Sequence, residues 1–98
     1  MKIRHHLVAR LDVLEAVEHY EQVGEVGLAA EFFAEVVKYV DQIADRPLSF
    51  RVHLKKYRRA NLPRFPYNIL FRIVDDNAVR ILAVRHNHRD PNYGTNRT

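Results

Sequence analysis

The strongest constraint on this fold is a change in the spacing of apolar residues near Pro47. Before it, apolar side chains recur every three or four residues, which is the spacing of amphipathic helices. After it, they run in short β-branched and aromatic segments typical of strands. Helices first and strands afterwards, within 98 residues, predict a single α+β domain covering residues 1–98.

The first predicted helix covers residues 9–23, where small and apolar side chains share one face. Asp12 and Glu15 fall on the opposite, polar side. Leu11 and Leu14 lie outside the apolar face, which predicts a contact on a second side of this helix. The apolar face consists of Ala9, Val13, Ala16, Val17 and Tyr20.

The second predicted helix covers residues 29–43 and ends before Pro47. Gly24 and Gly27 bracket the short connection, so the two helices form an antiparallel hairpin with a shared apolar seam. Its apolar face consists of Ala29, Phe32, Val36, Val40 and Ile43.

The strands follow the helices, except for one at the N-terminus. The predicted segments are residues 2–7, 57–62, 66–74 and 79–86. Asp75, Asp76 and Asn77 tolerate turn geometry and make the last two an antiparallel hairpin. The order β-α-α-β-β-β predicts a small antiparallel sheet packed against the N-terminal two-helix hairpin.

The last predicted strand has apolar residues at both alternate sets of positions, which indicates a central strand covered on both faces. The helix hairpin supplies one cover, and a partner chain is a candidate for the other. The polar segment 87–98 contains Pro91 and Gly94 and is expected to form a loop beside the sheet.

The net charge of +4 conceals two unlike halves. Residues 1–45 carry four Lys or Arg against nine Asp or Glu, whereas residues 46–98 carry twelve against three. The net charges are therefore −5 and +9. A polarised surface of this kind indicates an acidic partner, either nucleic acid or an acidic protein segment. The alternative is a surface that serves solubility alone.

The sequence also excludes several classes of protein. It has no cysteine, so disulfides, thiolate zinc sites and cysteine nucleophiles are absent. No run is apolar enough for a membrane span or a signal peptide, and we expect a cytoplasmic protein. His5 and His6 would point to opposite faces of a strand, and His86 and His88 lack a third ligand. We therefore expect no metal and no cofactor.

A cationic segment interleaved with aromatic residues is the first candidate binding site. Arginine pairs with phosphate and stacks on bases, and a tyrosine ring such as Tyr57 can support an unstacked base. On a strand, however, neighbouring residues face opposite sides, and charge on an edge strand also prevents aggregation. The predicted target-binding or nucleic-acid-binding residues are Lys55, Lys56, Arg58, Arg59 and Arg64.

The second candidate site lies at the end of the last strand. Cleavage of RNA through its 2′-hydroxyl needs a base, cations for the phosphate and an acid. His88, Arg85 or Arg89, and Tyr93 supply those groups. The alternative is that this segment only pins the tail to the sheet through Asp90 and the arginines.

A helix-turn-helix reading of the helical hairpin is disfavoured by charge. The second helix carries four carboxylates against Lys38, which opposes insertion into a DNA groove. Nucleic acid is therefore expected on the sheet and the tail. The four carboxylates are Glu31, Glu35, Asp41 and Asp45.

Several segments, taken in order and spacing, carry a family resemblance. They are residues 14–20 (LEAVEHY), 27–29 (GLA) before Phe32 and Phe33, Arg58-Arg59, 62–67 (LPRFPY) and 84–93 (VRHNHRDPNY). Together they resemble the RelE/ParE toxins of bacterial type II toxin-antitoxin modules. The resemblance implies a growth-inhibiting toxin, associated with plasmid stabilisation. It also implies neutralisation by a cognate antitoxin, whose acidic, amphipathic segment would cover the apolar sheet face.

The resemblance leaves the target open. RelE-type members are ribosome-dependent mRNA endoribonucleases, and a metal-independent site of that kind would use Arg85, His88, Arg89 and Tyr93. ParE-type members inhibit DNA gyrase without a catalytic site, and residues 63–67 (PRFPY) and 86–93 favour this lineage slightly. The remaining alternative is a non-toxic RNA-binding module. A homodimer and a toxin-antitoxin hetero-oligomer are both compatible with the resemblance.

Overall fold

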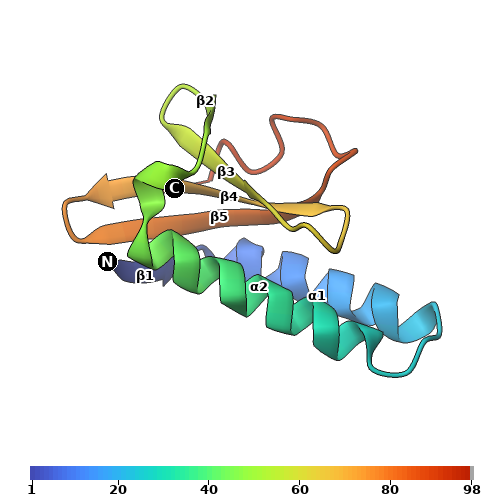
Figure 1. The fold of residues 1–98 in the computed structure, drawn as a ribbon. Coiled ribbons are helices and arrows are strands. Elements are labelled where there is room, and N and C mark those ends of the chain that lie inside the picture. Colours follow the sequence, from blue (N-terminus) through green and yellow to red (C-terminus); the bar gives the residue numbers. More distant parts are fainter. Residues whose placement is uncertain (98) are drawn as a thin grey trace.

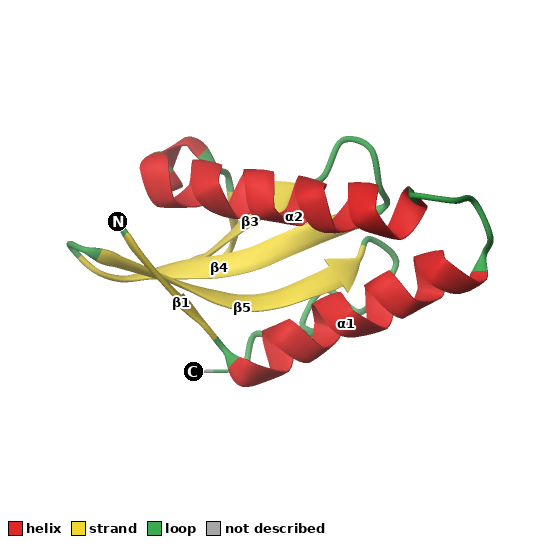
Figure 2. Ribbon diagram, turned by 90° about the horizontal axis from the view of Figure 1, so that it is seen from below, coloured by secondary structure: helices red, strands yellow, loops and turns green. Residues whose placement is uncertain are grey.

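The computed structural model describes residues 1–97 and has two layers, a helical hairpin and a sheet (Figure 1). Helices α1 (Leu7–Gln22) and α2 (Leu28–Asp45) lie side by side over one face of the sheet (Figure 2). A short 3-10 turn, η1 (Pro47–Ser49), follows α2. The sheet order is β1-β5-β4-β3-β2. The strands are β1 (Lys2–His5), β2 (Val52–Leu54), β3 (Tyr57–Asn61), β4 (Tyr67–Asp75) and β5 (Ala78–His86).

The predicted α+β class, with a sheet packed against an N-terminal helical hairpin, is confirmed. Two details differ. Strand β1 pairs with β5 in parallel and not in antiparallel fashion. The connection between them is long enough for this, since it contains both helices and strands β2, β3 and β4. The three-residue strand β2 was not predicted, since its side chains are too few to show a period.

The ends of both helices follow from local chemistry. His6 is the N-cap of α1, where its Nδ1 accepts a hydrogen bond from the backbone N–H of Val8 at 3.1 Å. Gly27, with φ of 87°, precedes α2, and Pro47 begins the turn after it. No described helix is long and apolar enough to cross a membrane.

The main core lies between the helices and the sheet, and an aromatic cluster anchors one end of it. The Phe32 ring centroid is 5.2 Å from that of Tyr20, 5.3 Å from that of Phe65 and 5.0 Å from that of Tyr67. Each such pair contributes about 0.5–1.5 kcal/mol beyond its area burial. The predicted apolar faces of both helices turn inward, with Phe32 and Ile43 fully buried.

The chain's own tail covers part of the second face of the sheet. Residues 87–97 (red in Figure 1) return across the face opposite the helices. Beneath this loop, Leu70, Leu82 and Ala83 are buried against Tyr57 and Tyr93. The expected loop beside the sheet is therefore present over the described residues, whereas Thr98 lies outside them.

Candidate functional site

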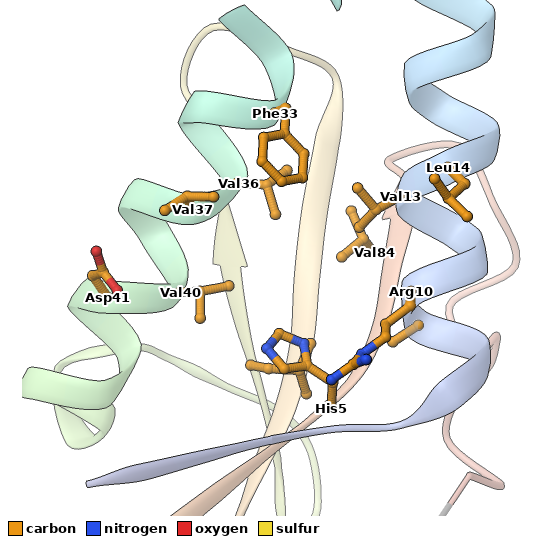
Figure 3. A pocket seen from close by; sticks show the side chains of 12 residues that line it. His5, Arg10, Val13, Leu14, Phe33, Val36, Val37, Val40, Asp41 and Val84 are labelled. Carbon is orange, nitrogen blue, oxygen red and sulfur yellow. The ribbon is translucent and has the colours of Figure 1, made fainter. Parts of the chain in front are cut away.

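An apolar groove lies between the two helices, above β5 (Figure 3). It has a volume of about 520 Å³. Leu14 on one wall is 57% exposed and Phe33 on the other is 52% exposed. Uncovered apolar side chains gathered in one hollow indicate a binding surface. We call this hollow the interhelical groove; its apolar lining is Ala9, Val13, Leu14, Phe33, Val36, Val37, Val40, Ile81 and Val84.

Polar residues occur mainly at one end of the interhelical groove. His5 and Arg10 lie there together, and Asp41 lies on the α2 side (Figure 3). Burial of His5 lowers its pKa below the ordinary value, and the nearby positive charge of Arg10 lowers it further. The imidazole therefore remains neutral at physiological pH. A ligand would meet an apolar trough with one cation at its end.

The groove corrects the expected position of the exposed apolar surface. The resemblance implied that the exposed apolar surface would lie on the sheet, where an antitoxin would cover it. The sheet's apolar residues are instead buried by the helices on one side and by the tail on the other. The second contact surface predicted from Leu11 and Leu14 is left uncovered, since Leu11 is 51% exposed.

Arg85 is the most deeply buried charged residue among residues 1–97, with 3% exposure. Its Nε donates to Oδ1 of Asn68 at 3.0 Å. Nη1 donates to the carbonyls of Pro91 at 2.6 Å and Tyr93 at 2.9 Å, and Nη2 donates to Nε2 of His53 at 3.0 Å. Burial lowers the pKa of Arg85, as does the neighbouring charge of Arg59. Nη1 thus holds the tail, while Nε and Nη2 fix the guanidinium to β4 and β2.

Tyr93 is held by a second network. Its hydroxyl donates to Oδ1 of Asp12 at 2.7 Å, while Oδ2 of Asp12 accepts from Nη1 of Arg97 at 2.8 Å and from the N–H of Val84 at 3.1 Å. The guanidinium carbons of Arg89 and Arg97 lie 4.4 Å and 4.6 Å from the centre of the tyrosine ring. This arrangement joins helix α1, strand β5 and both halves of the tail. We call Asp12, Tyr93 and Arg97 the tail latch.

The tail latch raises the pKa of two of its members, Tyr93 and Arg97. Burial raises the pKa of Tyr93, and the hydrogen bond to Asp12 adds to the rise. Burial alone would lower the pKa of Arg97, but its hydrogen bonds to Asp12 and Tyr93 outweigh that effect and raise it. The phenol therefore keeps its proton at neutral pH and directs it to a carboxylate within the chain.

His86 and His88, at the end of β5, are close to each other, but their side chains make different contacts. Nδ1 of His86 accepts from the backbone N–H of His88 at 3.1 Å, and the ring centroids are 5.1 Å apart. The ring of His86 also packs edge-on against Tyr67 at 5.3 Å. His88 is exposed. No described group of three His, Cys, Asp or Glu side chains has the arrangement of a metal site.

The cationic segment divides between different sides of the sheet. Lys55 and Lys56 form the exposed turn between β2 and β3. Arg58 faces the helical side and donates from Nη1 to the carbonyl of Phe50 at 2.7 Å. Tyr57 faces the tail, where its hydroxyl donates to the carbonyl of Thr95 at 2.5 Å. Its ring is half-buried and is not a free platform for a base.

The other two predicted binding cations lie on opposite sides of the sheet. Nε of Arg59 donates to Oδ1 of Asn61 at 2.9 Å on the face opposite the helices. Arg64 lies at the helical side, with Nη2 3.6 Å from Oε1 of Glu31, an exposed pair of little energetic weight. Its backbone N–H donates to Glu35, which is itself buried. The five cations therefore do not form one continuous patch.

Sequence reasoning missed the roles of Asp12 and Arg97. Asp12 was placed on the polar side of its helix, yet it is only 6% exposed, because the tail folds over that side. The sequence offered little indication of this role, because a carboxylate on the polar side of a helix is ordinarily solvated. The partner of Asp12, Arg97, is also 85 residues away in the chain. Phe33 and Val37, which line the groove, also lie outside the predicted apolar face of α2.

The comparisons with known proteins agree with this architecture. A family model described as "ParE toxin of type II toxin-antitoxin system, parDE" matches residues 3–91. Two relatives named Toxin ParE2, from Mycobacterium tuberculosis strains CDC 1551 / Oshkosh and ATCC 25618 / H37Rv, are each 30% identical over 93 residues. Those matches cover 93% of this chain and 86% of each relative. A solved structure described as "Chromosomal ParDE TA system from P. aeruginosa" has the same fold, with a TM-score of 0.75 at 19% identity over 88% of this chain and 95% of that chain.

Proposed function

The chain belongs to the ParE toxin family of type II toxin-antitoxin systems, and we propose that it arrests growth by binding DNA gyrase without covalent catalysis. The observation that carries this choice is the tail latch. The hydroxyl of Tyr93 donates to Asp12, and Arg85 is buried among acceptors from its own chain. A nuclease of the RelE kind would need these groups directed at a phosphate. Binding alone needs no such rearrangement.

Neutralisation by an antitoxin follows from the interhelical groove. An amphipathic helix placed in an apolar groove buries side chains that neither partner can cover alone. A segment that is disordered when free would acquire its structure on binding. Acidic side chains flanking its apolar face would be attracted to Arg10 at the end of the groove. The site of neutralisation is thus proposed on the helical side of the molecule.

The central test compares two readouts after expression in bacteria. Wild type and Tyr93→Phe are both expected to stop growth and to leave translating messages intact, because the phenol takes no part in chemistry. Purified wild type is expected to inhibit supercoiling by gyrase. Cleaved messages with wild type, lost in Tyr93→Phe at equal soluble expression, would establish the nuclease alternative instead. Normal growth at confirmed soluble expression would remove the toxin assignment.

The groove is tested by the matched pair Phe33→Lys and Val26→Lys. Phe33 lies in the groove, whereas Val26 is fully exposed in the connection between the helices. The probe is the cognate antitoxin. Phe33→Lys should weaken its binding about 100-fold, as expected for loss of a buried aromatic anchor with insertion of a charge. Val26→Lys should change it less than about threefold. Equal effects of the two changes would place the antitoxin elsewhere.

A further inference from the structure

Three arginines stand in a row across the sheet, on the face opposite the helices. Arg4 of β1 is the register partner of Arg80 in β5, and Arg80 is the partner of Arg72 in β4. Their neighbours Ile3, Val79 and Ile73 all point into the helical core, so the arginines point the other way. We call these three residues the arginine row.

The arginine row is unpaired within the described chain. None of its members forms one of the salt bridges of residues 1–97. Nε of Arg80 is also buried without a hydrogen-bond partner, and it is the one such buried side-chain nitrogen or oxygen in the described residues. Buried polar groups are ordinarily satisfied, and like charges directly opposite on neighbouring strands destabilise a sheet. A ligand anion would offset the repulsion between the three arginines.

Other charges on this face have the same sign. Lys2 is two residues from Arg4 on β1, and Arg59 lies on the same face of β3. Strands β1, β3, β4 and β5 contain no Asp or Glu except Asp75, the last residue of β4. The carboxylates belong mostly to the two helices on the far side. The molecule therefore presents cations on one face and acidic helices on the other.

Strands β1, β3, β4 and β5 lack large exposed apolar side chains in the described residues, which favours a phosphate-bearing partner over a protein. Protein interfaces have an apolar core, whereas protein–DNA interfaces are polar and strongly positive. Single-stranded nucleic acid would need free aromatic rings, but Tyr57 and Tyr93 are half-buried and hydrogen-bonded. These observations favour the backbone of a duplex.

We propose that the arginine row binds phosphate groups of duplex DNA independently of sequence. Strands lie about 4.8 Å apart, so the row spans about 10 Å between its outer backbones. Each strand of duplex DNA carries one negative charge per ~3.4 Å of helix axis, and the row therefore faces about three phosphates of one backbone. Guanidinium groups donate bidentately to phosphate oxygens, which suits the arginine row to this backbone. This binding surface is separate from the interhelical groove and does not require action on gyrase.

The test is fluorescence anisotropy of the full-length chain with a labelled duplex of about 20 base pairs at several salt concentrations. Wild type should bind, with affinity falling as salt rises. Arg72→Gln/Arg80→Gln should bind about tenfold more weakly at low salt, and its logarithmic salt slope should fall by about two. Arg46→Gln/Arg51→Gln makes the same charge change at exposed positions outside the row and should have less than a threefold effect.

Four outcomes would overturn the proposal. The first three are no duplex binding by wild type, equal losses in the two double variants, and stronger binding of a glutamate-rich peptide than of the duplex. The third would identify an acidic protein as the partner. Circular dichroism establishes that each variant is folded, and Arg4→Gln supplies a second test at an exposed position of the row. Unchanged duplex binding by both Arg4→Gln and the folded row variant would equally exclude this surface.

Discussion

Replacing Asp12 with Asn should destabilise the protein by about 3 kcal/mol, because it leaves Arg97 as a buried charge without its partner. The two side chains are 5% and 11% exposed and 2.8 Å apart, so solvent screens the pair very little. Breaking a buried pair on one side costs about 3–5 kcal/mol. The lower end applies because Asn keeps the shape of Asp and still accepts from the N–H of Val84.

The assay is urea unfolding at pH 7. With a slope of about 1.5 kcal/mol/M, the midpoint should fall by about 2 M. The matched control is Glu18→Gln, an exposed residue of the same helix, which should stay within about 0.5 kcal/mol of wild type. Asp12→Asn/Arg97→Met should recover part of the loss, since both charges are then removed.

Local release of the tail can be separated from global unfolding. Arg89 lies in the tail, so trypsin should cleave after it faster in Asp12→Asn than in Glu18→Gln under native conditions. An unfolding free energy for Asp12→Asn within about 0.5 kcal/mol of wild type, with unchanged tail cleavage, would refute the reasoning. The buried ion pair would then have no role in holding the tail.

Three further predictions concern the tail and the groove. Gly94→Ala should lose about 1–3 kcal/mol of stability, because φ is 88° and the new Cβ would lie 2.7 Å from Cβ of Ala83; Gly24→Ala, with positive φ but open space, should lose less, and equal midpoints in urea would contradict this. The lowered pKa of His5 should reduce stability as pH falls below about 6.5, where the unfolded state takes up the proton first, and thermal melts of His5→Gln should show a weaker decline; an identical pH profile would contradict it. Tyr93→Phe should cost about 1–2 kcal/mol of stability, measured by the same urea assay, through the donor lost to Asp12, and a variant as stable as wild type would count against the latch.

The helices could be predicted because their apolar faces are determined by local spacing. Phe32, Val36 and Ile43 recur at helical intervals, and each is buried as expected. Strands β4 and β5 could also be predicted, from their β-branched residues and the turn after Asp75. The parallel pairing of β1 was not, since parallel partners are joined by long crossovers that leave no turn signature between them.

The candidate sites show the opposite pattern, because they depend on contacts between distant residues. The cluster of Arg85, Arg89 and Tyr93 was predicted from the sequence, but the hydrogen bond from Tyr93 to Asp12 depends on how the tail crosses the sheet. The arginine row could not be predicted from the sequence for the same reason. Arg4 and Arg80 are 76 residues apart in the chain and become neighbours only through the β1–β5 register.

The measurement that tests the central claim most directly is supercoiling of relaxed plasmid by DNA gyrase in the presence of the purified chain. Wild type and Tyr93→Phe should both inhibit it, and the cognate antitoxin should restore it. Phe33→Lys should still inhibit gyrase but resist that rescue. Unimpaired supercoiling at toxin concentrations that arrest growth, together with cleavage of translating messages, would contradict the account.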